Sequence, residues 1–345
     1  MHQICLDANA IRYINKVKRG YISLNKAAMM AIELVEEKDV AWKRIYMLCR
    51  SPLKYETRCK VGEVVWAFLK RLEDILKDMG IRAKKSVLMH MILAAAYEDE
   101  TVIMSANMNA YKAKPSELDE RVQKAADKIN QNMPDIVFLQ EFKPGEGNYR
   151  VIDLLERLKM DYDVFYPYDY NENEEFDFCM CIALVERRMS QDARLLKTNV
   201  FSGIDGDSKL RSNMIKIGDK IFINAWMFQT LGVSGERLKV AKEMWDDILK
   251  IAGNMSLDKK EFYLMGDLNA YKGVEFGENI DKLEEKLVNT KLLSEVRRTT
   301  RGNRVLDYSY VNKSAAQAND VITTVLDMKG ISDHSCLLTR IKTKK

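Results

Sequence analysis

The sequence predicts an α+β protein whose core is two β-sheets flanked by helices, with a helical region before it. Three observations carry this prediction. Apolar residues recur at helical spacing through residues 1–98, short apolar runs begin at Thr101, and strands and helices then alternate without the rhythm of a parallel α/β fold. The 345 residues are enough for a full core and for more than one domain.

Residues 1–98 predict helices throughout and carry an excess of basic side chains. Ala27 to Val35 is apolar at helical spacing, and Val64 to Leu76 marks one face of a helix that Gly80 closes. The region holds 18 Lys and Arg against 11 Asp and Glu, although the whole chain has a net charge of only +4. Two roles stay open: a helical domain that packs on the main domain or on a partner, and a module that binds nucleic acid.

The first two strands of the second region each end in polar side chains. Residues 101–108 form one strand, which ends in Ser-Ala-Asn-Met-Asn at 105–109, and Asp135 to Gln140 form the next, which ends at Glu141. A helix that begins at the capping-box pattern of Ser116 to Asp119 separates them. For Glu141 taken alone, a solvated strand end is the simpler interpretation.

The elements that follow alternate in type. They are expected as a helix over 151–158, a loop of aromatic and acidic residues over 166–178, a strand over 179–185, a hairpin of 213–217 with 220–228, and a helix over 235–251. A strand over 262–265, a helix over 280–290, a strand over 305–311 and a closing strand after 335 complete the chain. This order favours two sheets flanked by helices.

The run from Phe262 to Met265 is the clearest strand, and functional groups are expected directly after it. Gly266 lets the backbone turn as it leaves the sheet, and Asp267 and Asn269 then project from the carboxyl end of the strand. Such strand ends are where α/β folds usually place their chemistry. An ordinary turn is the alternative for a Gly-Asp pair taken alone.

Histidine is scarce, and one histidine stands beside a carboxylate. Of the three histidines, His90 lies in an apolar helical stretch and is expected to pack, whereas His334 follows Asp333 at a strand entrance. The oxygens of carboxylates and amides at strand ends suit a hard divalent cation such as Mg²⁺, with Mn²⁺ as the alternative, and can also activate a water. The polar residues predicted at strand ends are Asn107, Glu141, Asp267, Asn269, Asp307, Asp333 and His334.

A basic loop precedes the strand that carries Asp307. Guanidinium groups at this place would lie near a bound phosphate, and a solvated loop is the equal alternative. The arginines of the loop are Arg297, Arg298, Arg301 and Arg304.

The cysteine and hydropathy patterns predict a cytoplasmic protein without a membrane segment. The six cysteines show neither a disulfide framework nor the spacing of a zinc site, which favours a reducing compartment. No signal peptide is predicted, and the longest apolar stretch, Val87 to Tyr97, is too short to span a bilayer. No stable membrane insertion is therefore expected.

Five motifs follow one another in the second region. They are Ser-Ala-Asn-Met-Asn (105–109), Asp-Ile-Val-Phe-Leu-Gln-Glu (135–141), Gly-Asp-Leu-Asn (266–269), Leu-Asp-Tyr (306–308) and Ser-Asp-His (332–334). Together they resemble the endonuclease/exonuclease/phosphatase superfamily, which includes enzymes like deoxyribonuclease I and apurinic/apyrimidinic endonucleases. The resemblance covers residues 99–345. It implies a four-layer α/β/β/α sandwich that cleaves phosphoesters with Mg²⁺.

The resemblance also implies a role for each matching residue at the metal. Glu141 would bind the ion, with Asn107 and Asp333 beside it. Asn109 would contact the substrate, and the position of the basic loop before the Asp307 strand predicts the same for its arginines. Carboxylate ligands in small number, completed by substrate phosphate, are typical of Mg²⁺ sites.

The remaining motif residues would act on the scissile bond. By resemblance, Asp267 would orient or deprotonate the attacking water or protonate the leaving oxygen, and Asn269 would hydrogen-bond the scissile phosphate. His334, oriented by Asp307, would face that phosphate. A carboxylate partner fixes the tautomer of a histidine and favours its charged form.

One position departs from the family pattern. Where many members carry a second His on the middle strand, this chain reads Asn-Ala-Trp-Met at 224–227. Trp has no basic nitrogen, so Trp226 can pack against a substrate or donate one hydrogen bond but cannot act as a base. Apurinic/apyrimidinic endonucleases also lack this His, so the departure does not remove the implied activity.

A nuclease that hydrolyses the phosphodiester bonds of nucleic acid is the first choice of function. The signatures of inositol-polyphosphate 5-phosphatases are missing, because Asn-Ala-Tyr follows Gly-Asp-Leu and no Trp-Cys-Asp-Arg segment precedes Asp307. Two alternatives stay open. One is a phosphatase that acts on a small-molecule or lipid phosphoester, and the other is a binding protein that keeps the fold with weakened chemistry.

Overall fold

The computed structural model divides the chain into two compact units. Residues 1–100 with 130–133 form the first unit, and residues 101–129 with 134–345 form the second. The predicted loop over 166–178 is described only at residues 166–168 and 170. The described residues are 2–7, 23–36, 42, 56–97, 100–109, 115–142, 151–168, 170, 179–196, 201, 206–229, 234–271, 276–290, 299–300 and 304–344.

The N-terminal unit combines helices with a small sheet. Its helices are α2 (Leu24–Glu36), α4 (Glu63–Asp78) and α5 (Lys85–Tyr97), and its strands β1 (His2–Asp7) and β2 (Glu56–Val61) pair antiparallel. The prediction of helices throughout residues 1–98 is therefore wrong for both strands. Ile4 and Leu6 are buried two residues apart, which is the period of a strand rather than of a helix.

The apolar face that predicted α4 is the face that the unit buries. Val65, Phe68, Leu69, Leu72 and Leu76 point into its core at helical spacing. The helix stops before Gly80, whose φ of +75° is a conformation that glycine adopts readily. His90 of α5 is only 1% exposed, as expected for a packing residue.

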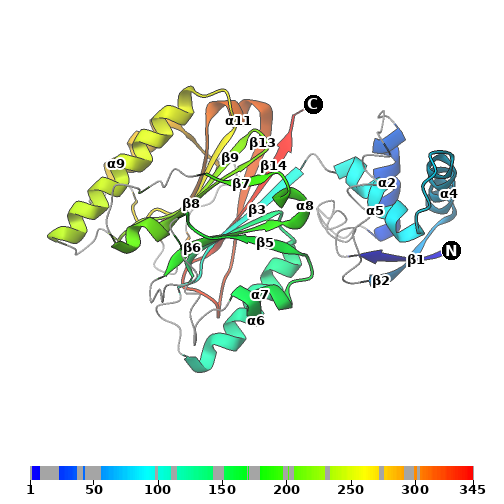
Figure 1. Ribbon diagram of the computed structural model, residues 1–345, viewed down its shortest axis with the longest axis horizontal. Helices are drawn as coiled ribbons and strands as arrows, with labels where there is room; N and C mark the ends of the chain where they lie inside the picture. The colour runs from blue at the N-terminus through cyan, green and yellow to red at the C-terminus, as the bar shows by residue number, and fades with distance from the viewer. Residues whose placement is uncertain are drawn as a thin grey trace. The chain divides into compact units, whose positions relative to one another are not determined.

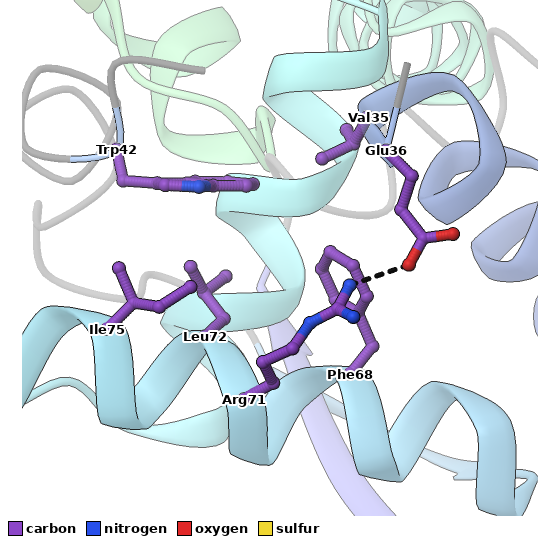
Figure 2. A pocket seen from close by; sticks show the side chains of 7 residues that line it. All are labelled: Val35, Glu36, Trp42, Phe68, Arg71, Leu72 and Ile75. Carbon is purple, nitrogen blue, oxygen red and sulfur yellow. Dashed lines mark hydrogen bonds and ion pairs between the residues drawn. The ribbon is translucent and has the colours of Figure 1, made fainter. Parts of the chain in front are cut away.

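A pocket of about 350 Å³ lies beside α4 (Figure 2). The side chain of Trp42 lies across it from Leu72 and Ile75 of α4. At its other side Arg71 Nη2 pairs with Glu36 Oε1 at 2.6 Å, and the guanidinium lies over the Phe68 ring. The pocket thus combines apolar walls with one ion pair.

Two six-stranded sheets form the core of the second unit (Figure 1). One has the order β13-β14-β3-β4-β6-β5, and the other has the order β11-β12-β10-β9-β8-β7. The strands of the first sheet are β3 (Glu100–Asn107), β4 (Ile136–Phe142), β5 (Tyr162–Phe165), β6 (Met180–Glu186), β13 (Asn319–Leu326) and β14 (Cys336–Thr343). Those of the second are β7 (Ala193–Leu195), β8 (Ser212–Ile217), β9 (Lys220–Trp226), β10 (Phe262–Asp267), β11 (Val288–Asn289) and β12 (Asp307–Val311).

Helices cover the outer faces of the two sheets. Figure 1 shows α9 (Glu236–Leu257) on one flank and α6 (Leu118–Asn132) with α7 (Val151–Arg157) on the other. The predicted four-layer α/β/β/α sandwich is confirmed. No helix of the described residues is long and apolar enough to cross a membrane. The other helices are η2 (Pro115–Glu117), α8 (Arg187–Ser190), η3 (Gly206–Arg211), α10 (Gly277–Lys286) and α11 (Lys313–Ala318).

Alternate residues of the central strands serve different layers. In β10, Tyr263 and Met265 join the apolar cluster between the sheets, which also includes Phe138 of β4. Phe262 and Leu264 join the cluster that packs under α9 and α10. Because both faces of such a strand are buried, its sequence is an unbroken apolar run rather than an alternating one.

One predicted helix is shorter than its sequence pattern. α10 ends at Lys286, so the expected helix over 280–290 is wrong at its last residues. Val288 and Asn289 instead form β11, where they pair with Val311 and Tyr310 of β12. Tertiary pairing therefore overrides the local helical pattern at this point.

The polar strand ends meet at one end of the sandwich. β3 is parallel to β4 and β9 is parallel to β10, so their carboxyl ends point the same way within each sheet. β12 is antiparallel to β10 and places Asp307 opposite Asp267. A hydrogen bond of 2.9 Å from Asn107 Nδ2 to Asp267 Oδ2 then joins the two sheets at this end.

Gly266 lets β9 and β10 approach each other directly before Asp267. Its φ is +144°, and a Cβ added there would lie 1.8 Å from the carbonyl oxygen of Ala225. A side chain therefore meets both a disfavoured backbone conformation and a backbone atom that cannot move aside. The position of Asp267 depends on this glycine.

Gly266→Ala is expected to lower the free energy of unfolding by at least about 3 kcal/mol, because the methyl group overlaps the backbone of β9 in a strained conformation. Urea unfolding followed by circular dichroism measures the change. Gly218→Ala is the matched control, since its φ is +57° and nothing lies within 4 Å of an added Cβ. The control is expected to lose only about 1 kcal/mol. Equal losses in both variants would contradict the steric explanation.

Candidate active site

A single amide joins two carboxylates that come from different sheets. Asn107 Nδ2 donates to Glu141 Oε1 at 3.0 Å and to Asp267 Oδ2 at 2.9 Å. Asn107 is fully buried, and Asp267 is 1% exposed. Because the amide nitrogen faces both carboxylates, Asn107 orients them as a donor in this structure.

Three residues of this cluster have a left-handed backbone. The φ angles are +49° at Asn109, +51° at Glu141 and +48° at Asn269. Glu141 lies in a β-bulge, where the pairing of β4 with β6 shifts register between Leu139 and Phe142. Bulges redirect side chains, and costly backbone conformations concentrate at functional sites. The bulge and the left-handed backbone at Glu141 thus set the direction of its side chain.

Asp267 accepts hydrogen bonds on both carboxylate oxygens from the turn that follows it. Its Oδ1 accepts from the backbone N–H of Asn269 at 2.9 Å, and its Oδ2 accepts from Asn269 Nδ2 at 3.1 Å. Burial raises the pKa of Asp267 to about 7, and the carboxylates of Asp307 and Glu141 act in the same direction, against the opposing charge of His334. A carboxyl group with this pKa can take up or release a proton near neutral pH.

His334 and Asp307 form a largely buried ion pair next to Asp267. The Nδ1 of His334 lies 2.9 Å from Asp307 Oδ2, and the two side chains are 13% and 4% exposed. Burial by itself would lower the pKa of His334, but the carboxylates of Asp307 and Asp267 outweigh it and raise the pKa to about 10. The imidazole is therefore positively charged at neutral pH.

The hydroxyl and the carbonyl of Thr299 hold the Asp307 and His334 segments together. Thr299 Oγ1 accepts from the N–H groups of Leu306 and Asp307, each at 3.0 Å. Its carbonyl accepts from Ser335 N at 2.7 Å. The sequence pattern did not single out Thr299, because its role depends on a pairing with a segment more than thirty residues away.

Arg121 connects the loop after β3 with the loop that carries His334. Its Nε donates to the carbonyl of Ile331 at 2.8 Å, and its Nη2 donates to that of Met108 at 3.4 Å. Asn109 makes a second connection, because its Nδ2 donates to Asp333 Oδ1 at 2.5 Å. Asp333 therefore borders the site, as the sequence predicted, whereas Arg121 was not anticipated.

Trp226 ends β9 beside Asp267 and carries an arginine on its ring. The Cζ atom of Arg211 lies 3.6 Å from the centroid of the Trp226 ring and 3.7 Å from that of Phe228. Both Arg211 and Trp226 are only 4% exposed. Sequence reasoning missed Arg211, because it lies in η3 outside every motif.

Among the four arginines of the basic loop, the structure describes only Arg304. Arg297, Arg298 and Arg301 lie outside the described residues. Arg304 is exposed, and its Cζ lies 5.6 Å from the centroid of the Tyr271 ring, two residues beyond Asn269. This arginine is thus beside the turn that follows Asp267.

Two sets of side chains are candidates for binding a metal ion. Asp267, Asp307 and His334 offer ligand atoms within 4.8 Å of one another. The imidazole of His334 is charged and its Nδ1 faces Asp307, so it has no free lone pair for a metal ion. This trio is therefore better suited to holding a proton than to binding a metal ion.

Glu141 fits a divalent cation more closely. Its Oε1 accepts from Asn107, and among the described residues its Oε2 accepts no hydrogen bond. Burial raises the pKa of Glu141, while the hydrogen bond from Asn107 and the positive charges of His334 and Arg211 lower it. A bound cation would favour the ionised carboxylate further.

Comparisons with known proteins agree with this geometry. A model of the endonuclease/exonuclease/phosphatase family matches residues 104–334, which contain all five motifs. The search of curated proteins found no match.

Solved structures with low sequence identity share the fold. The 3′-5′ exonuclease NExo from Neisseria meningitidis superposes with a TM-score of 0.53 at 15% identity, over 70% of this chain and 100% of that one. The catalytic domain of human nocturnin with a bound sulfate gives 0.51 at 18% identity, over 71% and 94%. A humanized D. rerio TDP2 gives 0.51 at 15% identity, over 71% and 100%.

Asp307→Asn is expected to lower the pKa of His334 by about 1–3 units. Burial of the imidazole lowers this pKa, and one fewer carboxylate then acts to raise it. NMR titration of the imidazole protons in the metal-free protein measures this change, and a chain with three histidines gives few signals to assign. An unaltered His334 titration would show that Asp307 does not hold its proton.

Proposed function

The chain belongs to the endonuclease/exonuclease/phosphatase family and is an enzyme that hydrolyses phosphoester bonds, and we propose that it cleaves the phosphodiester bonds of nucleic acid with a bound Mg²⁺ ion. The observation that carries the proposal is the convergence of Glu141, Asp267 and His334 at one end of the sandwich. A proton acceptor, a fixed cation and a carboxylate suited to metal are the groups that phosphoester hydrolysis needs.

Glu141 would hold the ion, and Asn107 keeps its carboxylate in place. Asp333 would stand beside the ion, tied to the loop after β3 through Asn109. When bound, a divalent cation lowers the pKa of a coordinated water and offsets negative charge on phosphate oxygens. Mn²⁺ prefers the same oxygen ligands and is the alternative ion.

Asp267 is the proposed general base or acid of the reaction. Its pKa of about 7 suits proton transfer with water or with the leaving oxygen. Asn269 Nδ2 donates to Asp267 and, at 2.9 Å, to the carbonyl of Met227, which occupies both of its N–H groups. We therefore propose that Asn269 orients Asp267 and does not contact the phosphate directly.

His334 supplies positive charge to the phosphate. Its Nδ1 side is fixed by Asp307, so Nε2–H is the donor that remains for a substrate oxygen. A preorganised cationic donor stabilises the charge that develops on phosphate oxygens in the transition state.

Two features support nucleic acid as the substrate. Structures of NExo from Neisseria, which share the fold, are described as a 3′ phosphatase bound to a product DNA hairpin and as a 3′-5′ exonuclease. In this chain the exposed Arg304 lies over Tyr271 beside the Asn269 turn. An arginine and an aromatic ring at the edge of a site suit a backbone phosphate and a stacked base.

A substrate panel tests the proposal. Plasmid DNA, an abasic duplex, single-stranded RNA and p-nitrophenyl phosphate are incubated with the enzyme and Mg²⁺, with EDTA as the metal-free control. Cleavage of at least one nucleic acid, abolished by EDTA, is expected. Turnover of the monoester alone would contradict the nuclease proposal and identify the enzyme as a phosphatase.

Glu141→Gln and His334→Gln are each expected to lower Mg²⁺-dependent kcat/KM by at least about 10²-fold. Higher Mg²⁺ is expected to restore part of the loss in Glu141→Gln only, because only that variant weakens the metal site. Glu236→Gln on the exposed start of α9 is the control and is expected to keep full activity. Full turnover in either site variant would show that the site is misplaced.

A further inference from the structure

Arg211 brings a further positive group to the site from an element that no motif marks. It is the last residue of η3, directly before β8, and it is 4% exposed. Its Cζ lies 3.6 Å and 3.7 Å from the ring centroids of Trp226 and Phe228. A guanidinium cannot lose its proton in a protein, so a permanent charge is buried here.

The two rings fix the direction of that charge. Aromatic rings contact a guanidinium through its faces, whereas its N–H groups point outward in its own plane. The side chain is therefore held as a flat fork that presents its donors at its edge. Such a fork matches the oxygens of a phosphate group better than an ammonium group does.

The backbone that carries the two rings also carries the hydrogen bonds of Asp267. Trp226 pairs with Asp267 in the register of β9 and β10, and Met227 N donates to the carbonyl of Asp267 at 2.9 Å. Asn269 Nδ2 donates to the carbonyl of Met227. Arg211 is thus positioned by the same strand end that positions Asp267.

The charge of Arg211 reaches the proposed metal ligand. Its guanidinium interacts electrostatically with the carboxylate of Glu141. The charged side chains of the site thus come from separate elements: they are the carboxylates of Glu141, Asp267, Asp307 and Asp333 and the cations His334 and Arg211. A buried cation that the fold holds in place attracts an anion strongly, because its own desolvation has already occurred on folding.

We propose that Arg211 binds an oxygen of the substrate phosphate, and that Trp226 and Phe228 are positioning residues that hold its guanidinium toward the site. The inference rests on the proposed function and names the side chain that recognises the phosphate. It also gives Trp226 a role that does not require it to touch the substrate.

Binding of inorganic phosphate tests the proposal without requiring turnover. The dissociation constant is measured by isothermal titration calorimetry in the full chain with Mg²⁺. Arg211→Met is expected to weaken binding at least about tenfold, and Arg211→Lys to weaken it too, because an ammonium group lacks the planar fork. Arg237→Met on the exposed surface of α9 is the matched control and is expected to bind as the wild type does. Wild-type affinity in Arg211→Met, or no phosphate binding by the wild type, would overturn the proposal.

The positioning role of the rings is tested by a conservative replacement. Trp226→Leu and Phe228→Leu are expected to weaken phosphate binding about threefold or more, whereas Trp226→Phe, which keeps a ring under the guanidinium, stays near the wild type. Thermal unfolding of each variant shows whether the fold is kept. Equal losses in Trp226→Phe and Trp226→Leu would overturn the role of ring stacking.

The two proposals fail separately. Phosphate binding that depends on Arg211, without cleavage of any nucleic acid, would contradict the proposed substrate and leave the role of Arg211 in place. Cleavage of nucleic acid with unchanged kcat/KM in Arg211→Met would contradict only the role of Arg211.

Discussion

The hydrogen bonds from Asn107 to Glu141 and Asp267 are the interaction on which the site depends. They tie together strand ends from two sheets that also share a buried apolar cluster. Apolar contacts are not directional, so they leave the relative placement of two sheets loosely specified. Directional polar contacts remove this freedom. A second polar contact between the sheets lies directly before Glu141 in the chain, where Gln140 Nε2 donates to Asn224 Oδ1 at 2.7 Å. The carboxylates of the site are thus placed by a polar seam between the sheets.

Charge balance explains why so many ionisable groups tolerate burial at one end of the sandwich. Burial raises the pKa of Asp267 and of Glu141, and the positive charge of His334 acts to lower both values. The imidazole in turn keeps its proton because carboxylates surround it. Each group is therefore stabilised in its charge state by the others, and a bound phosphate and divalent cation would add charges of both signs.

The departure at Trp226 has a physical explanation in the packing of Arg211. A histidine at this strand end would offer a small ring that can itself be charged, whereas the indole offers a wide face on which a guanidinium can lie. The positive charge at this corner of the site then comes from η3, whereas the ring comes from β9. This arrangement needs η3 and the end of β9 to be adjacent, which the hairpin of β8 and β9 ensures.

The sequence by itself determined the layered fold of the second unit and the polar residues at its strand ends, since apolar runs, glycine stops and the residues after them are local features. It did not determine β1 and β2, or the change from helix to strand after Lys286, because these depend on pairing with distant segments. Only the tertiary structure decided that Asn107 orients two carboxylates, that Thr299 and Arg121 fix the loops around His334, and that Trp226 carries Arg211. Each of these contacts joins residues that the chain separates and that only the register of the strands and the approach of the two sheets bring together.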